Sequence, residues 1–262
     1  MSQIEFTGER LPGGGEQEFA VDMQRHLAAY RYAATLAAGR TVLDAGCGEG
    51  YGTALLAGVA ARALGIDRPA VAAAAAARYA GRGAEYEGVD LERLADLGRR
   101  FELVVSFQVI EHVIDPVGYL RALAACTAPG GTLVVTTPNR LMSVSENPYH
   151  LREWTAPELR DLATPVLPGV QVLGVHGSAR VREYERARGE QVQRILRLDP
   201  LGLRRLVPAV VIERVFPVLA KLVRRRVATG GAMPTVGPDD FAVGGDDLEH
   251  ALDLLLLVRG SA

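Results

Sequence analysis

The segment VLDAGCGEGYGT, residues 42–53, constrains the fold of this chain more than any other stretch of its sequence. A short apolar run ends here at glycines in the spacing G-x-G-x-G, and residues 51–61 then have the composition of a helix. Glycines allow a tight turn and let the backbone approach a ligand without interference from a Cβ atom. The first turn of the following helix has free N–H groups that suit a carboxylate or a phosphate. The segment therefore predicts an α/β fold with a ligand site where the first strand ends.

Strand and helix patterns alternate along the first half of the chain. The predicted strands lie at residues 41–46, 62–67, 84–90, 101–107 and 131–137. The predicted helices lie at residues 17–38, 51–61, 68–81, 91–99 and 117–127. Such alternation is typical of a parallel sheet with helices on both of its faces.

The second half of the chain departs from this simple alternation. The patterns predict a short helix at 155–163, a strand at 170–177, mostly helical residues at 180–227 and a final buried strand at 253–259. We therefore expect a helical insertion, residues 178–240, between the last two strands, where it would form a lid over the site. We expect a single domain over residues 1–262 that begins with a loop and a helix at residues 1–38.

Composition excludes several classes of protein. The formal net charge is −2, so no general attraction to nucleic acid is expected. The two cysteines stand at unrelated positions, which argues against a disulfide framework and a cysteine-based zinc site and fits a reducing compartment. The N-terminus lacks a signal-peptide pattern, and no uninterrupted apolar run reaches the length of a transmembrane helix. We therefore expect a cytoplasmic protein.

Acidic residues end three successive predicted strands, at Asp44, Asp67 and Asp90. Ligands of open α/β sheets bind at this carboxyl edge of the sheet. Asp67 is placed to accept hydrogen bonds from both hydroxyls of a ribose, and Asp90 with the neighbouring Leu91 suits the amine and the ring of an adenine. Any one of these carboxylates could instead cap a helix or a loop, but the three together predict a nucleoside site.

These residues resemble the class I S-adenosylmethionine-dependent methyltransferases. The resemblance implies a Rossmann-like α/β fold with a seven-stranded sheet whose seventh strand is antiparallel, which fits the late apolar run DLLLLVR. It also implies S-adenosylmethionine as the cofactor. By the family's pattern, the cofactor contacts are Asp44, Gly46, Cys47 and Gly48 near the methionine part, Asp67 at the ribose, Asp90 and Leu91 at the adenine, and Gln108 beside the sulfonium. Arg31 is a further candidate for the methionine carboxylate, or else an exposed helical arginine.

Three polar residues, Gln108, Glu111 and His112, follow the fourth predicted strand at the point where its hydrophobic run ends. A second polar segment, residues 136–155, follows the neighbouring strand, so His150 is expected to come close to His112. Methyl transfer to a hydroxyl requires removal of its proton. A positioned base accelerates this step by about 10² to 10⁴-fold, and a bound divalent cation can instead lower the pKa of the hydroxyl. Glu111, His112 and His150 are our candidate catalytic residues.

The same residues resemble a metal site found in two groups of the family. The small-RNA 3′-end 2′-O-methyltransferases, and in part the ubiquinone-pathway O-methyltransferases, have Glu-x-x-Glu-His at this position and bind a divalent metal there. Gln108 stands here in place of the first Glu, and one charge fewer weakens a site for a hard cation. Two schemes are therefore open: Mg²⁺ or Mn²⁺ held by Glu111, His112 and His150, or a histidine base without a metal. In a third interpretation Glu111 caps a loop and His112 packs under the sheet edge.

Other segments predict the acceptor. FTGERLP, TTPNR and NPYHLREWTAPEL resemble a bacterial group that methylates saccharides. HGSARVREYERARG and DDFAVGGDDLEHALDLLLLVR resemble the mycofactocin oligosaccharide methyltransferases of actinobacteria. This resemblance implies O-methylation of a glucose unit on a glycosylated redox cofactor. The candidate acceptor contacts are Asn139, Tyr149, Arg180 and Tyr184, of which the last two would belong to the lid or to a solvated helical face.

Other functions stay open at this point. The same fold serves small-molecule and RNA 2′-O-methyltransferases, although the near-neutral charge disfavours RNA. A partner protein that binds S-adenosylmethionine without catalysis is a third alternative, against which the intact glycine turn and the histidines argue. The basic, amphipathic residues 201–227 could touch a membrane surface, but packing on the domain is favoured because Pro208 and Pro217 would break a surface helix. A homodimer is expected only from the general frequency of such assemblies.

Overall fold

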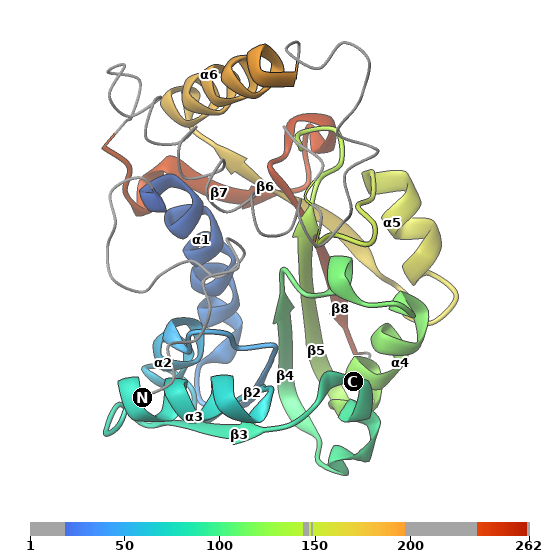
Figure 1. Cartoon of the computed structure of the whole chain (residues 1–262). Helices are drawn as coiled ribbons and strands as arrows, with labels where there is room; N and C mark the ends of the chain where they lie inside the picture. Colours follow the sequence, from blue (N-terminus) through green and yellow to red (C-terminus); the bar gives the residue numbers. More distant parts are fainter. Residues whose placement is uncertain (1–18, 144–146, 148, 197–234, 261–262) are drawn as a thin grey trace.

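The computed structural model describes residues 19–143, 147, 149–196 and 235–260. They form one mixed eight-stranded sheet with the strand order β3-β2-β1-β4-β5-β8-β6-β7 (Figure 1). The strands are β1 (Thr41–Ala45), β2 (Arg62–Asp67), β3 (Ala84–Gly88), β4 (Phe101–Phe107), β5 (Thr127–Pro138), β6 (Gln171–Gly177), β7 (Phe241–Gly244) and β8 (Asp253–Arg259). β1 to β5 pair in parallel, whereas β8 runs antiparallel between β5 and β6. The α/β fold and the antiparallel late strand are therefore confirmed.

β7 is a strand that the sequence patterns did not predict. The sequence resemblance implies seven strands and the patterns predict none over these residues, but Phe241–Gly244 pairs antiparallel with β6 at the end of the sheet. A segment of four residues that ends in glycine has too little periodicity to indicate a strand. Its strand form depends on β6 as a pairing partner and on Phe241, which packs beside Val175 of β6.

Helices cover both faces of the sheet. They are α1 (Ala20–Ala37), α2 (Tyr51–Ala57), α3 (Pro69–Arg78), α4 (Pro116–Cys126), α5 (Ala156–Ala163) and α6 (Ala179–Leu196). α1 and α2 pack into the core on one face, and α4 and α5 pack into the core on the other. Successive residues of a strand point to opposite faces, so Leu255 and Leu257 of β8 join the first core while Leu254 and Leu256 join the second. This double burial explains why the run DLLLLVR shows no polar alternation.

α6 forms the beginning of the predicted helical insertion. Its Tyr184 is fully buried in a third core with Val21 and Ala28 of α1. Figure 1 shows α6 beyond the end of the sheet that carries β6 and β7. Tyr184 is thus a core residue, and its prediction as an acceptor contact is wrong. Residues 197–234, which include the amphipathic segment 201–227, lie outside the described residues, and the role of the insertion as a lid stays a prediction.

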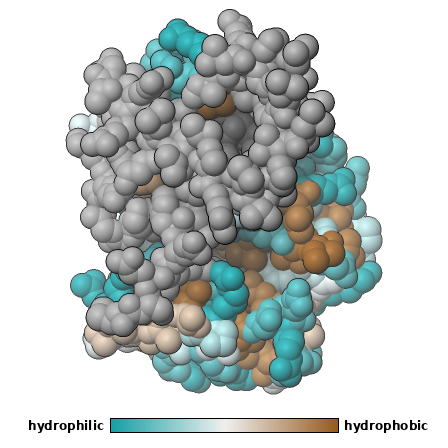
Figure 2. All heavy atoms as spheres, viewed as in Figure 1, coloured by the Kyte–Doolittle hydropathy of each residue, from teal (hydrophilic) through white to brown (hydrophobic). Residues whose placement is uncertain are grey.

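The described surface mixes polar and apolar side chains (Figure 2). Its large exposed apolar residues are Val59, Ile114, Leu141 and Leu151. Single exposed apolar side chains are normal on a folded protein. Within the part of the chain that the structure describes, no helix combines the length and the apolarity needed to cross a bilayer.

Candidate active site

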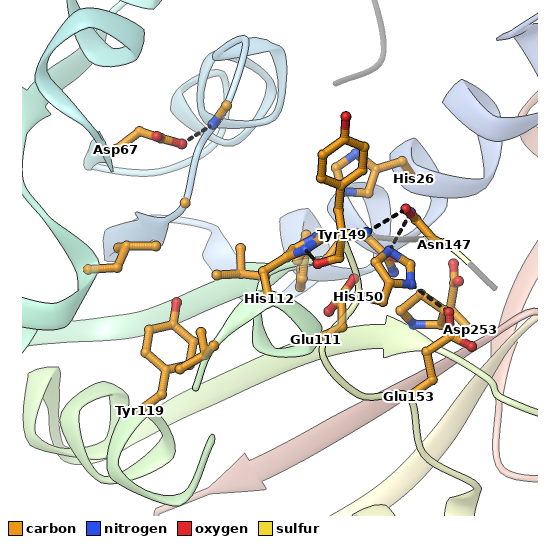
Figure 3. Close-up of a pocket in the computed structure, with 18 of the residues that line it drawn as sticks. His26, Asp67, Glu111, His112, Tyr119, Asn147, Tyr149, His150, Glu153 and Asp253 are labelled. Atoms are coloured by element: carbon orange, nitrogen blue, oxygen red, sulfur yellow. Dashed lines mark hydrogen bonds and ion pairs between the residues drawn. The ribbon is translucent and has the colours of Figure 1, made fainter. Parts of the chain in front are cut away.

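A cavity of about 1180 Å³ opens at the carboxyl edge of the sheet (Figure 3). Its wall is formed by the glycine turn after β1, the ends of β2 and β3, the loops after β4 and β5, the first turns of α1 and the start of β8. A typical pocket for one ligand has a volume of about 300 to 1,000 Å³. The cavity therefore has room for a nucleoside cofactor and a second ligand together.

The glycine turn is shaped by backbone conformations that other residues avoid. Gly46, Gly48 and Gly50 have φ angles of 84°, 51° and 86°. A Cβ atom on Gly46 would lie 2.5 Å from Cγ2 of Val109, which is too short a contact for any side chain. Gly46, Cys47 and Gly48 all line the cavity. The turn thus presents bare backbone to a ligand, as the spacing of the glycines predicts.

Asp67 and Asp90 reach the cavity from the ends of β2 and β3. Asp67 accepts hydrogen bonds from the backbone N–H groups of Gly48 (2.9 Å) and Arg68 (2.7 Å), which hold its carboxylate at the rim of the glycine turn. Asp90 caps the short helix that follows β3, and Leu91 lies next to it in the lining of the cavity. The capping role and the cofactor role proposed for Asp90 are therefore compatible.

Gln108 follows β4 in a backbone conformation that residues other than glycine rarely adopt, with a φ of 57°. Its backbone N–H donates to the carbonyl of Thr136 (3.0 Å), and its Nε2 donates to the hydroxyl of the same residue (3.4 Å). The side chain lines the cavity. Strained residues that neighbouring strands hold in place are characteristic of functional sites.

Asp44 lies beneath the glycine turn and does not line the cavity. Its fully buried carboxylate accepts hydrogen bonds from the hydroxyls of Tyr30 (3.2 Å) and Thr53 (2.6 Å). Burial raises the pKa of Asp44 to about 7, although the two hydroxyls oppose that rise. Asp44 therefore supports the turn from below, and this placement does not provide the direct cofactor contact that we predicted.

The structure also contradicts the predicted contact of Arg31. Nη2 of Arg31 donates to Oε1 of Gln24 (2.9 Å), and Arg31 is absent from the lining of the cavity. The residues of α1 that do line it are Asp22, Arg25 and His26. Arg31 follows His26 by five positions, and five residues rotate a helix by about 140°. The helix therefore turns Arg31 away from the cavity that its first turns reach.

Glu111 and His112 stand across the cavity from Asp67 (Figure 3). Glu111 is fully buried, and its Oε2 accepts a hydrogen bond from the hydroxyl of Thr137 (3.1 Å). Its Oε1 accepts no hydrogen bond from any described residue. Burial raises the pKa of Glu111 to about 8 and lowers the pKa of His112, so both side chains favour their neutral forms. Nδ1 of His112 donates to the carbonyl of Tyr149 (2.9 Å), which assigns the ring proton to that nitrogen.

His150 joins this group from the segment after β5. Its ring meets the ring of His112 edge to face with centroids 4.9 Å apart, which confirms the predicted proximity. Nδ1 donates to Oε1 of Glu153 (2.5 Å), and Nε2 accepts a hydrogen bond from Nδ2 of Asn147 (2.9 Å). Burial by itself would raise the pKa of Glu153, but the hydrogen bonds from His150 and Ser143 lower it overall. A carboxylate that holds one ring nitrogen orients the other nitrogen as a base.

Comparison with known proteins decides the family. A family model described as a methyltransferase domain matches residues 19–166, more than half of the chain. A probable S-adenosylmethionine-dependent methyltransferase of Mycolicibacterium smegmatis is 37% identical over 203 residues, which cover 73% of this chain and 76% of that protein. The chain belongs to the S-adenosylmethionine-dependent methyltransferases. A probable methyltransferase of the same kind from Mycobacterium tuberculosis is 34% identical over 197 residues, which cover 72% of this chain and 70% of that protein.

Two further comparisons are less extensive or less similar in sequence. The ubiquinone biosynthesis O-methyltransferase of a Methylobacterium species is 39% identical over 109 residues, which cover 40% of this chain and 43% of that protein. The crystal structure of an S-adenosylmethionine-dependent methyltransferase from Thermotoga maritima has a TM-score of 0.59 at 14% identity, over 97% of this chain and 98% of that chain. The similarity to the Thermotoga maritima structure shows that this methyltransferase has the fold of the family.

Two predicted acceptor contacts of the methyltransferase lie elsewhere. Asn139 is buried, and its Nδ2 donates to the carbonyl of Ala251 (2.8 Å), so it ties the end of β5 to the segment before β8. Its prediction as an acceptor contact is wrong, because its amide is used within the fold. Arg180 is exposed, pairs with Asp240 (3.1 Å) and does not line the cavity. Of the four predicted contacts, Tyr149 alone lines the cavity.

The methyltransferase also has a group of side chains with the spacing of a metal site. Each of Glu111, His112 and His150 offers one ligand atom, and these atoms lie within 4.8 Å of one another. Two imidazoles and one carboxylate suit a transition metal better than Mg²⁺, which prefers oxygen ligands. Both nitrogens of His150 are already engaged, by Glu153 and Asn147, so a metal ion at Nε2 would have to displace Asn147.

Replacing Glu111 with glutamine is expected to change how stability depends on pH. Burial raises the pKa of Glu111 from 4.5 to about 8 in the folded methyltransferase. As the pH rises between these two values, the unfolded chain loses this proton while the folded protein retains it, so stability falls. The glutamine variant does not lose stability in this way. The difference in the free energy of unfolding between the variant and the wild type should therefore favour the variant more at about pH 8.5 than at about pH 5.

Urea unfolding of both proteins at the two pH values measures this effect. Asp161→Asn, a change at an exposed carboxylate of α5, is the control and should shift stability equally at both pH values. A gain from Glu111→Gln that does not depend on pH would show that Glu111 is ionised in the folded protein.

Proposed function

We propose that this methyltransferase transfers a methyl group to a hydroxyl of a saccharide, with His150 as the base that removes the hydroxyl proton. The observation that carries the proposal is the pair of His150 and Glu153, in the wall of the same cavity as the glycine turn and Asp67. A sugar hydroxyl does not ionise near neutral pH, so its methylation needs a base that is already positioned.

The residues around the glycine turn fit S-adenosylmethionine. Gly46, Cys47 and Gly48 bring backbone into the wall of the cavity, and the space where a Cβ atom of Gly48 would stand is open. Asp67 is held where it would accept hydrogen bonds from ribose hydroxyls, and Asp90 and Leu91 would hold the adenine. When bound, this cofactor supplies a methyl group on a positively charged sulfur.

The hydrogen bonds of His150 support its proposed role as a base. Glu153 holds the proton of Nδ1, so Nε2 is the nitrogen that takes the proton from the acceptor. Nε2 accepts a hydrogen bond from Asn147, and the acceptor hydroxyl would take the place of that donor. The carboxylate of Glu153 then stabilises the imidazolium, as in catalytic triads. Glu111, with its pKa raised to about 8, is mostly protonated at neutral pH and can donate a hydrogen bond beside the base.

Sequence resemblance supports the saccharide acceptor. The segments FTGERLP, TTPNR and NPYHLREWTAPEL resemble saccharide methyltransferases, and the two tail segments imply a glucan on a glycosylated cofactor such as mycofactocin. The near-neutral charge does not favour RNA. A phenol is the second candidate acceptor, because part of the chain is similar to ubiquinone biosynthesis O-methyltransferases.

Methyl transfer from labelled S-adenosylmethionine tests the proposal. The acceptors are neutral glucose oligosaccharides and, for the second candidate, a catechol, each with EDTA and with added Mg²⁺ or Mn²⁺. We expect label in the oligosaccharides and no effect of EDTA, because Glu153 and Asn147 engage both nitrogens of His150. Turnover that EDTA abolishes and a metal restores would make Glu111, His112 and His150 metal ligands. Label in the catechol alone would contradict a saccharide acceptor.

A further inference from the structure

Charged side chains from three distant segments meet at the wall of the cavity. Asp22 and Arg25 belong to the first two turns of α1, Glu185 and Arg188 belong to α6, and Asp253 is the first residue of β8. Nη1 of Arg188 lies 3.1 Å from Oδ1 of Asp22, and its Nη2 lies 3.2 Å from Oε2 of Glu185. Nε of Arg25 lies 3.4 Å from Oδ2 of Asp253. We call these five residues the ionic cluster.

The carboxylates of the ionic cluster are buried and its arginines are partly buried, yet four of its members line the cavity: Asp22, Arg25, Arg188 and Asp253. The side chains of its three carboxylates are between 4% and 7% exposed. Oδ1 of Asp253 and Oε1 of Glu185 accept no hydrogen bond from any residue that the structure describes, and of these two residues Asp253 lines the cavity. A buried carboxylate oxygen without a partner lowers the stability of the fold. Proteins in which apolar residues replace a buried ion pair are often at least as stable as the original protein. A ligand therefore explains the open oxygen of Asp253 better than the stability of the fold does.

The charge balance of the ionic cluster disfavours an anionic ligand. Its three carboxylates and two guanidinium groups leave one net negative formal charge. Both guanidinium groups are already paired with carboxylates, unlike the open arginine fork that binds a phosphate or a carboxylate. A hydroxyl group both donates and accepts hydrogen bonds, so a neutral polyol can bond to the carboxylates and to the guanidinium groups. An aromatic acceptor would desolvate these charges without replacing their bonds to water.

The ionic cluster lies next to the catalytic group. Burial is the main cause of the raised pKa of Glu111, and the charge of Asp253 adds to it. Burial also raises the pKa of Asp253, while Arg25 and Gln108 oppose that rise. These couplings require Asp253 to be near both Glu111 and Gln108, and Figure 3 shows all the labelled side chains around one cavity.

We infer that the ionic cluster binds the hydroxyl groups of a neutral sugar unit of the acceptor and thereby selects neutral saccharides over anionic or phenolic acceptors. This inference rests on the proposed function, because it assigns the acceptor end of the same cavity. The methionine part of S-adenosylmethionine is the competing occupant, since it carries both a carboxylate and an ammonium group. The experiment therefore has to separate acceptor binding from cofactor binding.

The test compares the variants Asp253→Asn and Arg188→Gln with the wild type. The probe is maltotetraose, whose binding to protein saturated with S-adenosylhomocysteine is measured by saturation-transfer NMR, and whose methylation gives kcat and KM. We expect each substitution to raise KM by about tenfold or more and to leave the Kd of S-adenosylhomocysteine nearly unchanged. The kcat should stay unchanged in Arg188→Gln, whereas Asp253→Asn also removes a charge that acts on Glu111. Arg186→Gln is the matched control, because Arg186 lies on the same helix with a side chain that is 62% exposed.

Each outcome has one meaning. An unchanged KM in both folded variants would overturn the inference and leave the proposed function intact. A parallel loss of affinity for S-adenosylhomocysteine would assign the ionic cluster to the methionine part instead.

If neither variant folds, a competition experiment on the wild type decides. Trigalacturonate, an anionic oligosaccharide, should not displace maltotetraose, and displacement at a similar concentration would overturn the inference. No binding of maltotetraose to the wild type would overturn the inference as well, and methylation of catechol but of no saccharide would overturn the proposed function itself.

Discussion

Replacing His150 with alanine is expected to lower kcat by about 10² to 10⁴-fold and to leave the affinity for S-adenosylhomocysteine nearly unchanged. In the proposed mechanism Glu153 orients Nε2 of His150 as the base, whereas the predicted cofactor contacts lie at the glycine turn and at Asp67. Turnover is measured with labelled S-adenosylmethionine and a neutral oligosaccharide, and affinity is measured by calorimetry.

Two further variants sharpen this test. His250→Ala is the matched control, because His250 forms a similar pair with Asp247 (2.7 Å) but does not line this cavity. Glu153→Gln should lower kcat by about tenfold without changing KM, since glutamine keeps an oxygen for Nδ1 but loses the charge that stabilises the imidazolium. Full turnover in His150→Ala would transfer the role of the base to another group, and His112 would be the next residue to replace.

Replacing Asp67 with alanine should weaken the binding of S-adenosylhomocysteine by about 10 to 100-fold. A hydrogen bond to a charged group contributes about 1.5 to 3 kcal/mol, and the carboxylate is held by the N–H groups of Gly48 and Arg68 at the rim of the glycine turn. Calorimetry measures the change in Kd. Asp96→Ala is the control, because Asp96 has a side chain that is 65% exposed and lies outside the cavity.

A second substitution at Asp67 separates binding from folding. Asp67→Asn keeps an oxygen that can accept the hydrogen bond from Gly48, so the glycine turn should retain its shape while the charge is lost. We expect its affinity to lie between those of the wild type and Asp67→Ala. Equal affinity in all three proteins would remove Asp67 from the cofactor site.

Local patterns were sufficient for most of the fold and for one side of the site. The carboxyl ends of parallel strands meet at one edge of a sheet, so residues that end successive strands converge without any further information. Gly46, Asp67 and Asp90 line the cavity for this reason. His112 and His150 approach each other for the same reason, because β4 and β5 are neighbours in the sheet.

The two incorrect predictions on helices share a physical cause. The face that a helix turns toward its neighbours depends on packing, and an irregular pattern of polar residues does not reveal it. Arg31 was expected at the cavity and Tyr184 at the acceptor, but the first faces Gln24 and the second lies in the core. Asn139 was predicted as an acceptor contact, although its amide bonds within the fold. The sequence analysis did not identify Glu153 as the partner of His150, because a glutamate three residues after a histidine is common in any sequence.

The sequence by itself determined the alternation of strands and helices, the glycine turn and the acids that end the strands, because each of these depends on neighbouring residues. Only the tertiary structure decided which charged side chains of α1, α6 and β8 meet at the cavity. The ionic cluster joins residues from Asp22 to Asp253, and its charges can be buried only because their partners arrive from other segments. Tyr184, packed against α1, brings the following turn of α6 and its Arg188 to Asp22. That contact depends on the packing of two distant helices, which no local pattern encodes.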